Sequence, residues 1–419
     1  MGAELEEKYN EGIAFNPFLL KWGEEIIFPS TRKMKEYGNR VYNRYPARSV
    51  FLVPRAILSQ YKNQDLIVLD PFMGSGTTAV ETLISGNKPA GTEMDPFARM
   101  IAEVSTTVYP QNELKELQQV YFSIQSKWPS YEASPIPDLF GIEHWFKPAD
   151  FQDLLRLKAC ILVLSPRKYL SYFLIAFADC IKPVSLMERQ STKPYISTKY
   201  AKETKSVGES FEYSHNAHFE AIRQMSEIAK PNPIKWLGSD ATDFRAEENS
   251  IDIAITSPPY INALDYTRCI KVESAMCNLT DTKGTAQLRK MQVGHEARRY
   301  QSINDVVMRI FCPYYEQIQS TDKGRADTCM AYFNDLYKNL TCVYVALKKD
   351  SIYHMIIGDN TIRGVEIPTH EIIAHLGEQI GYKWIGYYKY EIKDHRTSVP
   401  RNNAKNKIEY EHVIMLQKK

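Results

Sequence analysis

Short apolar runs that end in a polar residue recur along the chain and predict strands of a buried sheet. Residues 66–69 are apolar and precede Asp70, and residues 251–255 form a second run, broken by Asp252, that ends at Thr256. Parallel strands are covered on both faces and are therefore apolar throughout instead of alternating. The pattern predicts an α/β chain with parallel strands.

A glycine-rich loop follows the first of these strands. Residues 70–78 read Asp-Pro-Phe-Met-Gly-Ser-Gly-Thr-Thr, and Gly74 and Gly76 can adopt backbone angles closed to other residues and let a ligand approach the main chain. Thr77 can begin a helix. A second short strand ends at Glu93, where a dinucleotide-type fold hydrogen-bonds ribose hydroxyls. The unit predicts a nucleoside-binding loop, although tight turns without function use the same residues.

Three kinds of ligand compete for this loop. A nucleoside triphosphate loop ends in Gly-Lys-Ser/Thr, whereas this loop has Gly76-Thr77-Thr78 and no lysine, which disfavours a triphosphate. A nicotinamide dinucleotide stays open, because residues 74–79 match the form G-x-G-x-x-A. The second apolar run and its continuation favour a third ligand, a methyl donor.

A double proline follows that second run. Thr256 is followed by Ser257, Pro258, Pro259 and Tyr260, and consecutive prolines disfavour both strand continuation and a helical residue before them. The serine and the first proline carbonyl are then held extended, with the tyrosine beside them. Taken alone, two prolines can simply end a strand. Together with the glycine loop they favour function, since open α/β sheets bind ligands outside the carboxyl ends of strands, near the topological switch point.

The two segments together resemble a known enzyme family. Residues 70–78 and the Thr-Ser-Pro-Pro-Tyr at 256–260 are similar to the motif pair of S-adenosylmethionine-dependent DNA amino-methyltransferases, which modify cytosine N4 or adenine N6. In that family Ser-Pro-Pro-Tyr is typical of cytosine-N4 enzymes, and Asp- or Asn-Pro-Pro-Tyr of adenine-N6 enzymes. The resemblance implies a cytosine-N4 enzyme, with adenine N6 as the closest alternative.

The resemblance assigns roles to residues of this sequence. Glu93 matches the acidic residue on the ribose, and Asp240 matches the acceptor for the cofactor's adenine amino group. The implied catalytic residues are Ser257, Pro258, Pro259 and Tyr260. The implied residues for S-adenosylmethionine are Asp70, Pro71, Phe72, Gly74, Ser75, Gly76, Thr77, Thr78, Glu93, Asp240, Ala241, Tyr45 and Pro46.

The resemblance also implies a Rossmann-like class I methyltransferase fold, a seven-stranded, mostly parallel sheet with an antiparallel last strand. The predicted strands lie at 66–70, 89–92, 234–238, 251–256, 351–357, 383–390 and 409–417. Residues 104–230 are far more than the crossover helix that two neighbouring parallel strands need. This block is therefore predicted to be a mainly helical insertion, with helices near 112–128 and 149–180. It is also a candidate DNA-recognition lobe. It separates a cofactor-binding part, 1–103, from the rest of the catalytic domain, 231–419, which includes a candidate DNA-contacting segment at 281–330.

Methyl transfer to an exocyclic amino group requires mainly positioning. The amino lone pair is delocalised into the ring, whereas the sulfonium methyl is a strong electrophile. The Ser257 oxygen and the Pro258 carbonyl could accept the two amino hydrogens while Tyr260 stacks on the base. In duplex DNA the base has to be flipped out of the stack. Tyr266 is either a second stacking residue or an ordinary packing residue. No metal is needed for this chemistry.

The cysteines exclude a carbon-5 cytosine methyltransferase. That reaction needs a cysteine nucleophile, characteristically after proline, and none of the seven cysteines follows a proline. No C-x-x-C pair occurs, which argues against a structural zinc site. An odd number of dispersed thiols without a signal peptide predicts a reduced cytoplasm, and no apolar stretch is long enough for a bilayer. The family resemblance implies a prokaryotic, nucleoid-associated protein without membrane contact.

Basic residues are clustered along the chain. The net charge of the whole chain is only +2, so acidic residues elsewhere offset these clusters. Residues 182–205 carry six basic and two acidic side chains with tyrosines between them, and residues 32–55 carry seven basic side chains and one acidic. A solvated surface explains any one cluster, but several around one site favour double-stranded DNA as partner. The candidate DNA contacts are Arg48, Lys193, Lys199, Arg298, Arg299 and Arg396.

A restriction endonuclease often accompanies such a modification enzyme, but nothing in the chain shows one. A function of a different class also stays open, namely a catalytically inactive DNA-binding protein on a methyltransferase fold. That protein would bind no S-adenosylmethionine.

Overall fold

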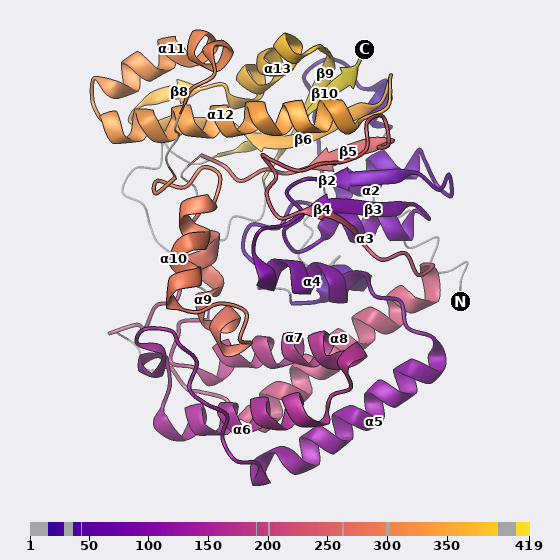
Figure 1. Cartoon of the computed structure of the whole chain (residues 1–419), viewed down its shortest axis with the longest axis vertical. Coiled ribbons are helices and arrows are strands. Elements are labelled where there is room, and N and C mark those ends of the chain that lie inside the picture. Colours follow the sequence, from indigo (N-terminus) through magenta and orange to yellow (C-terminus); the bar gives the residue numbers. More distant parts are fainter. Residues whose placement is uncertain are drawn as a thin grey trace.

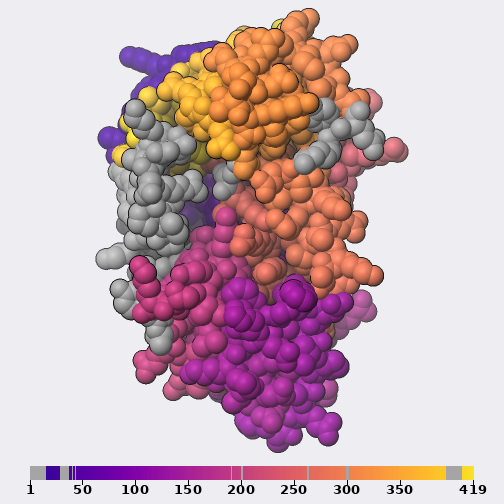
Figure 2. Space-filling view, turned by 90° about the vertical axis from the view of Figure 1, so that its left-hand side faces the viewer, coloured from indigo at the N-terminus to yellow at the C-terminus, as the bar shows by residue number. Residues whose placement is uncertain are grey.

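The computed structural model of the chain describes residues 16–28, 37–42, 44–189, 191–199, 202–261, 264–298, 302–392 and 408–419. The chain forms a large sheet covered by helices and, at the other end of the molecule, a group of helices (Figure 1). Figure 2 shows these two ends on the surface, with the helical group in purple and magenta and the C-terminal half of the chain in orange and yellow.

The sheet has eight strands in the order β1-β9-β10-β6-β5-β2-β3-β4. The strands β9 and β6 both pair antiparallel with β10, and every other neighbouring pair is parallel. The fold is therefore the predicted Rossmann-like methyltransferase sheet with its antiparallel last strand. The strands are β1 (Glu24–Ile26), β2 (Ile67–Asp70), β3 (Lys88–Thr92), β4 (Lys235–Gly238), β5 (Ile253–Thr256), β6 (Ile352–Gly358), β9 (Tyr382–Glu391) and β10 (Tyr410–Lys418).

All seven predicted strands are present, but the predicted number was one too low. The additional strand, β1, adds parallel to the outer edge of β9. It is three residues long and only Ile26 is buried, so it has no apolar run by which it could be recognised. A small hairpin, β7 (Asn360–Ile362) with β8 (Val365–Ile367), stands outside the sheet and was also not predicted.

Alternate residues of the central strands face opposite helical layers, as strand geometry requires. On β5, Ile253 and Ile255 pack with α2 (Leu52–Ser59), whereas Ala254 faces the layer that contains α12 (Lys323–Ala346). The second layer also contains α11 (Asp305–Gln319) and α13 (Thr369–Ile380). Both faces are buried, which explains why the strands are continuously apolar in sequence.

The helical group lies within the block predicted as an insertion. It consists of α5 (Gln111–Lys127), α6 (Pro148–Leu164), α7 (Arg167–Val184) and α8 (Val207–Ile228). The first three match the predicted helical stretches, whereas α8 was not predicted. The hydrophobic core of this helical group is continuous with buried residues of α4 (Pro96–Thr106) and α9 (Tyr266–Met276). The helices therefore pack directly on the elements that follow β3 and β5.

Two further helices complete the architecture near the cavity described below. The helix α3 (Thr77–Ile84) follows β2, and α10 (Thr282–Met291) lies beyond α9. Short 3-10 turns occur at Pro17–Leu19, Tyr37–Arg40, Trp128–Ser130 and Ile142–Trp145. None of the helices that the structure describes is both long and apolar enough to cross a lipid bilayer.

Candidate functional site

The glycine loop and the double proline lie at adjacent strand ends. The strand β2 pairs with β5, with Leu69 opposite Ala254. Beyond this pair, the hydroxyl of Thr256 donates a hydrogen bond of 2.5 Å to Oδ1 of Asp70. The chain runs from β2 outward to β3 and β4, and from β5 outward in the other direction to β6. The two motifs therefore meet at the topological switch point, where open α/β sheets bind ligands.

A cavity opens at this point and encloses about 1010 Å³ of space, part of it open to solvent. The glycine loop, the end of β3, the turn after β4 and the double-proline segment all contribute to its wall. The lining residues that the sequence predicted are Tyr45, Arg48, Asp70, Pro71, Phe72, Gly74, Ser75, Thr77, Glu93, Asp240, Ala241, Ser257, Pro259 and Tyr266. One cavity thus unites the predicted methyl-donor and acceptor sides.

Several predicted site residues lie outside the lining. Pro46, Gly76, Thr78, Pro258 and Tyr260 do not line this cavity. The backbone of Gly76 has φ +84°, and a Cβ added there would lie 2.9 Å from Cα and Cβ of Ala102 on α4. Gly76 is therefore required for the close approach of α4 to the loop, and its effect on a ligand would be indirect.

Glu93 fixes the shape of the glycine loop. One carboxylate oxygen accepts a hydrogen bond of 2.7 Å from the amide of Gly74, and the other accepts one of 2.8 Å from the amide of Asp95. Gly74 adopts φ +52°, in the left-handed region that favours glycine. Asp95 in turn caps α4 by accepting from the amides of Phe97 and Ala98. The loop, the end of β3 and the start of α4 are thereby held as one unit.

Burial changes the protonation of two of the four carboxyl groups in the wall, those of Asp70 and Glu93. It raises the pKa of Asp70 to about 6, against the opposing effect of hydrogen bonds from Thr256, Thr78 and the Phe72 amide. It also raises the pKa of Glu93 to about 7, with a further increase from the Asp95 charge and opposing hydrogen bonds from the Asp95 and Gly74 amides. Both groups thus change charge near neutral pH, which is typical of functional sites.

The turn after β4 contributes Ser239, Asp240 and Ala241 to the wall. Oδ1 of Asp240 accepts two hydrogen bonds of 2.8 Å, from the amide and from the hydroxyl of Thr242. These bonds fix the carboxylate beside the cavity, as an acceptor for a ligand amino group would require. Asp240 and Glu93 approach the cavity from neighbouring strands, β4 and β3.

Tyr260 is held by the last strand of the sheet. Its hydroxyl donates a short hydrogen bond to Glu411 on β10, and the same carboxylate accepts another short bond from Tyr390 on β9. Of the two aromatic residues considered for stacking, only Tyr266 belongs to the cavity wall. Tyr266 is also the first residue of α9, so the same residue lines the cavity and begins a helix.

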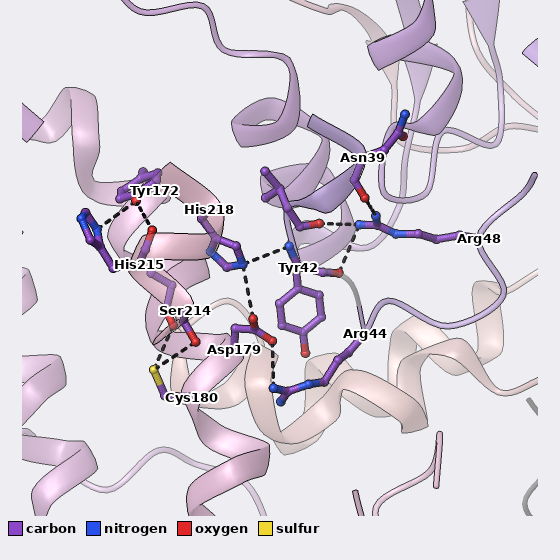
Figure 3. Close-up of polar contacts among 12 residues, drawn as sticks. Asn39, Tyr42, Arg44, Arg48, Tyr172, Asp179, Cys180, Ser214, His215 and His218 are labelled. Carbon is purple, nitrogen blue, oxygen red and sulfur yellow. Dashed lines mark hydrogen bonds and ion pairs between the residues drawn. The ribbon is translucent and has the colours of Figure 1, made fainter. Parts of the chain in front are cut away.

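The segment before the glycine loop contributes Tyr45, Ala47, Arg48 and Ser49 to the cavity wall. It is anchored on the helical group (Figure 3). Arg48 donates to the carbonyls of Asn39, Val41 and Tyr42 at 2.6, 2.6 and 3.1 Å. It was predicted as a DNA contact, but its guanidinium binds the backbone of its own segment. The segment is thus folded back on itself beside Tyr45 and the cavity.

A buried charge network makes the connection to the helices (Figure 3). The carboxylate of Asp179 on α7 lies 3.3 Å from the guanidinium of Arg44 and 3.3 Å from Nε2 of His218 on α8. The same Nε2 accepts a hydrogen bond of 3.2 Å from the amide of Tyr42. Burial alone would raise the pKa of Asp179, but Arg44 and His218 together lower it. Sequence reasoning missed this network because its members are spread over three distant segments.

The other predicted DNA contacts differ in their surroundings. Arg298 is directed inward, because it pairs with Asp335 and donates to the carbonyl of Met291, next to the cavity wall. In this structure the Arg298 guanidinium is therefore occupied by protein contacts, and its contact with DNA stays a prediction. Lys193 and Lys199 are exposed. Arg299 and Arg396 lie outside the described residues.

Some wall residues were not among the predicted site residues. These are Ala47, Ser49, Met73, Thr92, Met94, Asp95, Ser239, Thr267, Met291, Gln292 and Val293. Asp95 could have been recognised, since Asp-Pro at 95–96 is a helix N-cap followed by proline in the first turn. The position of Met291 to Val293 depends on the packing of α10 and has no local pattern.

The chain is similar in sequence to known DNA methylases and Type II methyltransferases. A family model described as DNA methylase matches residues 12–103. The Type II methyltransferase M.MvaI of Kocuria varians is 24% identical over 408 residues, which cover 91% of this chain and 89% of the relative. M.AvaI of Nostoc sp. (strain PCC 7120) is 20% identical over 416 residues, 90% of this chain and 85% of the relative.

A solved structure, the putative DNA modification methylase TTHA0409 of Thermus thermophilus in complex with S-adenosyl-L-methionine, is 18% identical and covers 41% of this chain and 49% of its own, with a TM-score of 0.22.

Proposed function

Because the chain belongs to the family of DNA methylases that modify cytosine N4 or adenine N6, we propose that it transfers the methyl group of S-adenosylmethionine to the N4 amino group of cytosine in double-stranded DNA. The observation that carries the proposal is the hydrogen bond between Thr256 and Asp70, which joins the two motif segments at one cavity. The choice of cytosine follows from Ser257, which stands where adenine-N6 enzymes are expected to have Asp or Asn.

The cofactor residues fit a nucleoside with a charged methionine tail. Glu93 and Asp240 offer carboxylate oxygens from the ends of β3 and β4, which suit ribose hydroxyls and an amino group. Gly74 brings its backbone to the cavity wall without a side chain, and an added Cβ would lie 3.6 Å from the ring of Tyr45. Bound there, S-adenosylmethionine would supply an electrophilic methyl group.

The acceptor side is formed by Ser257 and Pro259 in the wall. We expect the Ser257 hydroxyl and the Pro258 carbonyl to accept the two amino hydrogens of the target base, so that the nitrogen lone pair faces the methyl group. Correct orientation of this kind can lower a barrier by several kcal/mol. Tyr266 in the wall is the residue best placed to contact the flipped base, while Tyr260 supports the segment through Glu411.

The helical block is proposed to contact DNA outside the cavity. Lys193 and Lys199 are exposed on the basic stretch that follows α7, where they could neutralise backbone phosphates. A Type II modification enzyme would act with a cognate restriction endonuclease in a bacterial cytoplasm, and both relatives carry the Type II name.

Expression in a host without DNA methylation tests the proposal. Nucleosides from the genomic DNA would be separated and identified by mass spectrometry, and we expect N4-methylcytosine. N6-methyladenine in its place would support the rival specificity. In the Ser257→Ala variant we expect at least a tenfold loss of turnover, the effect of about 1.4 kcal/mol in the barrier, with unchanged affinity for S-adenosylmethionine.

An equal loss of turnover and cofactor affinity in Ser257→Ala would contradict its assigned role. A purified wild-type chain that gives no calorimetric heat with S-adenosylmethionine and leaves DNA unmodified would favour the DNA-binding alternative without catalysis.

A further inference from the structure

A cluster of two histidines and one aspartate lies at the carboxyl end of β6, apart from the cavity. Asp359 directly follows β6, His370 is the second residue of α13, and His412 is on β10. One potential ligand atom from each residue lies within 4.8 Å of the other two, and no other group of this kind occurs among the described residues. Two histidines from separate segments therefore lie beside the carboxylate of a third segment.

Both imidazole rings present Nδ1 to that carboxylate. Nδ1 of His370 lies 2.8 and 3.0 Å from the two oxygens of Asp359, and Nδ1 of His412 lies 4.0 Å from Oδ2. The rings are stacked, with centroids 3.9 Å apart and planes inclined by 4°. The two nitrogens and the carboxylate thus surround one small region.

A purely structural role explains only part of this arrangement. Asp359 accepts a hydrogen bond of 3.2 Å from the backbone amide of His370, so it also anchors the first turn of α13. That role accounts for Asp359 and His370 but not for His412. Nδ1 of His412 is buried without a hydrogen-bond partner, in a residue that is 9% exposed. A buried polar atom left in this state is costly and requires an explanation.

We propose that Asp359, His370 and His412 bind a divalent first-row transition metal ion, with zinc as the best match. Two imidazoles and one carboxylate are a common zinc donor set, and a water molecule can take the fourth position. The side chain of Asp359 is 36% exposed, which leaves a route for the ion and its water.

Binding of the ion would require defined movements of the ligand atoms. Ligand atoms of a tetrahedral zinc ion lie about 2.0–2.2 Å from the metal and about 3.3 Å from each other. The His370–Asp359 contact of 2.8 Å would therefore open by about 0.5 Å, and the His412–Asp359 contact of 4.0 Å would close by about 0.7 Å. The two rings would also have to turn out of their parallel stack, because each Nδ1 lone pair lies in its own ring plane and parallel planes cannot meet at one ion.

The ion would stabilise the sheet at the carboxyl end of β6 and take no part in methyl transfer. It would join the end of β6, the start of α13 and β10, and His412 is next in sequence to Glu411, which binds Tyr260. Sequence reasoning found no zinc site because it considered cysteine pairs. The three ligands here are separated along the chain and have no motif spacing.

Metal titration of the chelator-treated, full-length protein tests the site. Zn²⁺ would be titrated in competition with a chromophoric chelator, and Co²⁺ would be followed by visible absorption, which reports tetrahedral nitrogen and oxygen ligands. We expect one equivalent to bind. His412→Asn and Asp359→Asn should each weaken Zn²⁺ binding at least about tenfold. His375→Asn, an exposed histidine on the same helix that pairs with Glu378, is the matched control and should bind like the wild type.

Retention of wild-type affinity in both His412→Asn and Asp359→Asn would overturn the proposal. A cobalt spectrum with thiolate charge-transfer bands would also overturn it, since it would place the ion on the cysteines. Asp359→Asn keeps the buried histidines intact, so it tests the site even if His412→Asn does not fold.

Discussion

Tyr260, in the double-proline segment, donates a hydrogen bond to Glu411, which lies 151 residues later on the last strand. Glu411 also binds Tyr390, and burial raises the pKa of its carboxyl group, against the opposing effect of these two hydroxyls. The antiparallel last strand thus supports the loop after β5, although β6 lies between them in the sheet. The orientation of Tyr260 depends on this carboxylate.

Replacement of Glu411 by Gln should therefore reduce turnover more than cofactor affinity. A hydrogen bond to a charged group contributes about 1.5–3 kcal/mol, so we expect a loss of turnover of about 10- to 100-fold with S-adenosylmethionine affinity within a factor of two. Steady-state kinetics and calorimetry measure the two quantities. Glu409→Gln changes an exposed residue on the same segment and serves as the control. A large loss of cofactor affinity in Glu411→Gln would contradict this role.

Cofactor binding should strengthen as the pH rises through about 7. The pKa of Glu93 is raised to about 7, mainly by burial, and only its carboxylate form offers acceptors on both oxygens. Below its pKa, protonation should weaken binding by up to about tenfold per pH unit. Asp70, with its pKa raised to about 6, should add a second decrease at lower pH. Calorimetric titrations with S-adenosylmethionine from about pH 5.5 to 8.5 measure this profile.

Two comparisons separate charge from hydrogen bonding in that profile. Glu93→Gln should lose the step near pH 7. S-adenosylhomocysteine, which lacks the sulfonium charge, should show a smaller dependence on pH. A wild-type profile that is flat between pH 6 and 8 would contradict the role of Glu93 as a titrating acceptor.

Gly76→Val should disrupt the site through packing. The new Cβ would lie 2.9 Å from two atoms of Ala102, and the residue would have to keep φ +84°. Left-handed backbone costs about 1–2 kcal/mol for a residue with a side chain, and the overlap would displace α4 from the loop. We expect lower stability in urea unfolding and at least a tenfold weaker affinity for S-adenosylmethionine, the equivalent of about 1.4 kcal/mol.

Gly364→Val separates these two causes. Gly364 has nearly the same backbone angle, φ +85°, but no atom lies within 4 Å of an added Cβ. It should show the backbone cost alone and normal cofactor binding. Equal effects of the two substitutions would show that the contact with Ala102 is unimportant.

Most of the sheet and much of the cavity wall could be predicted from the sequence, because both depend on local patterns. Apolar runs located β2 and β5, the family resemblance placed the other strands, and loop residues such as Gly74 and Glu93 follow closely after β2 and β3. What could not be predicted depends on contacts between distant segments. The three-residue β1 has only one buried side chain. Glu411 contacts Tyr260 across the sheet. The residues next to Arg298 in the sequence do not indicate that it pairs with Asp335.

The buried carboxylate of Asp179 should be essential for the attachment of the helices to the cavity segment. Asp179→Asn leaves the Arg44 guanidinium without its anion, and removal of one partner of a buried pair costs about 3–5 kcal/mol. The Arg44 side chain is 31% exposed, which reduces the expected loss to about 2–3 kcal/mol. Urea unfolding measures the stability, and Asp153→Asn, in a surface pair with Arg156, should change it by less than about 1 kcal/mol.

The pH dependence of this loss distinguishes charge from shape. The pKa of Asp179 is lowered in the folded protein by Arg44 and His218, against the effect of burial. Its contribution to stability is therefore complete above the unfolded pKa of about 3.9 and is lost as the pH falls through the lower folded value. The difference between wild type and Asp179→Asn should stay constant from about pH 5 to 7 and shrink in more acidic solution. A difference that persists unchanged into acid would show that packing, and not the ion pair, attaches the helices to the cavity segment.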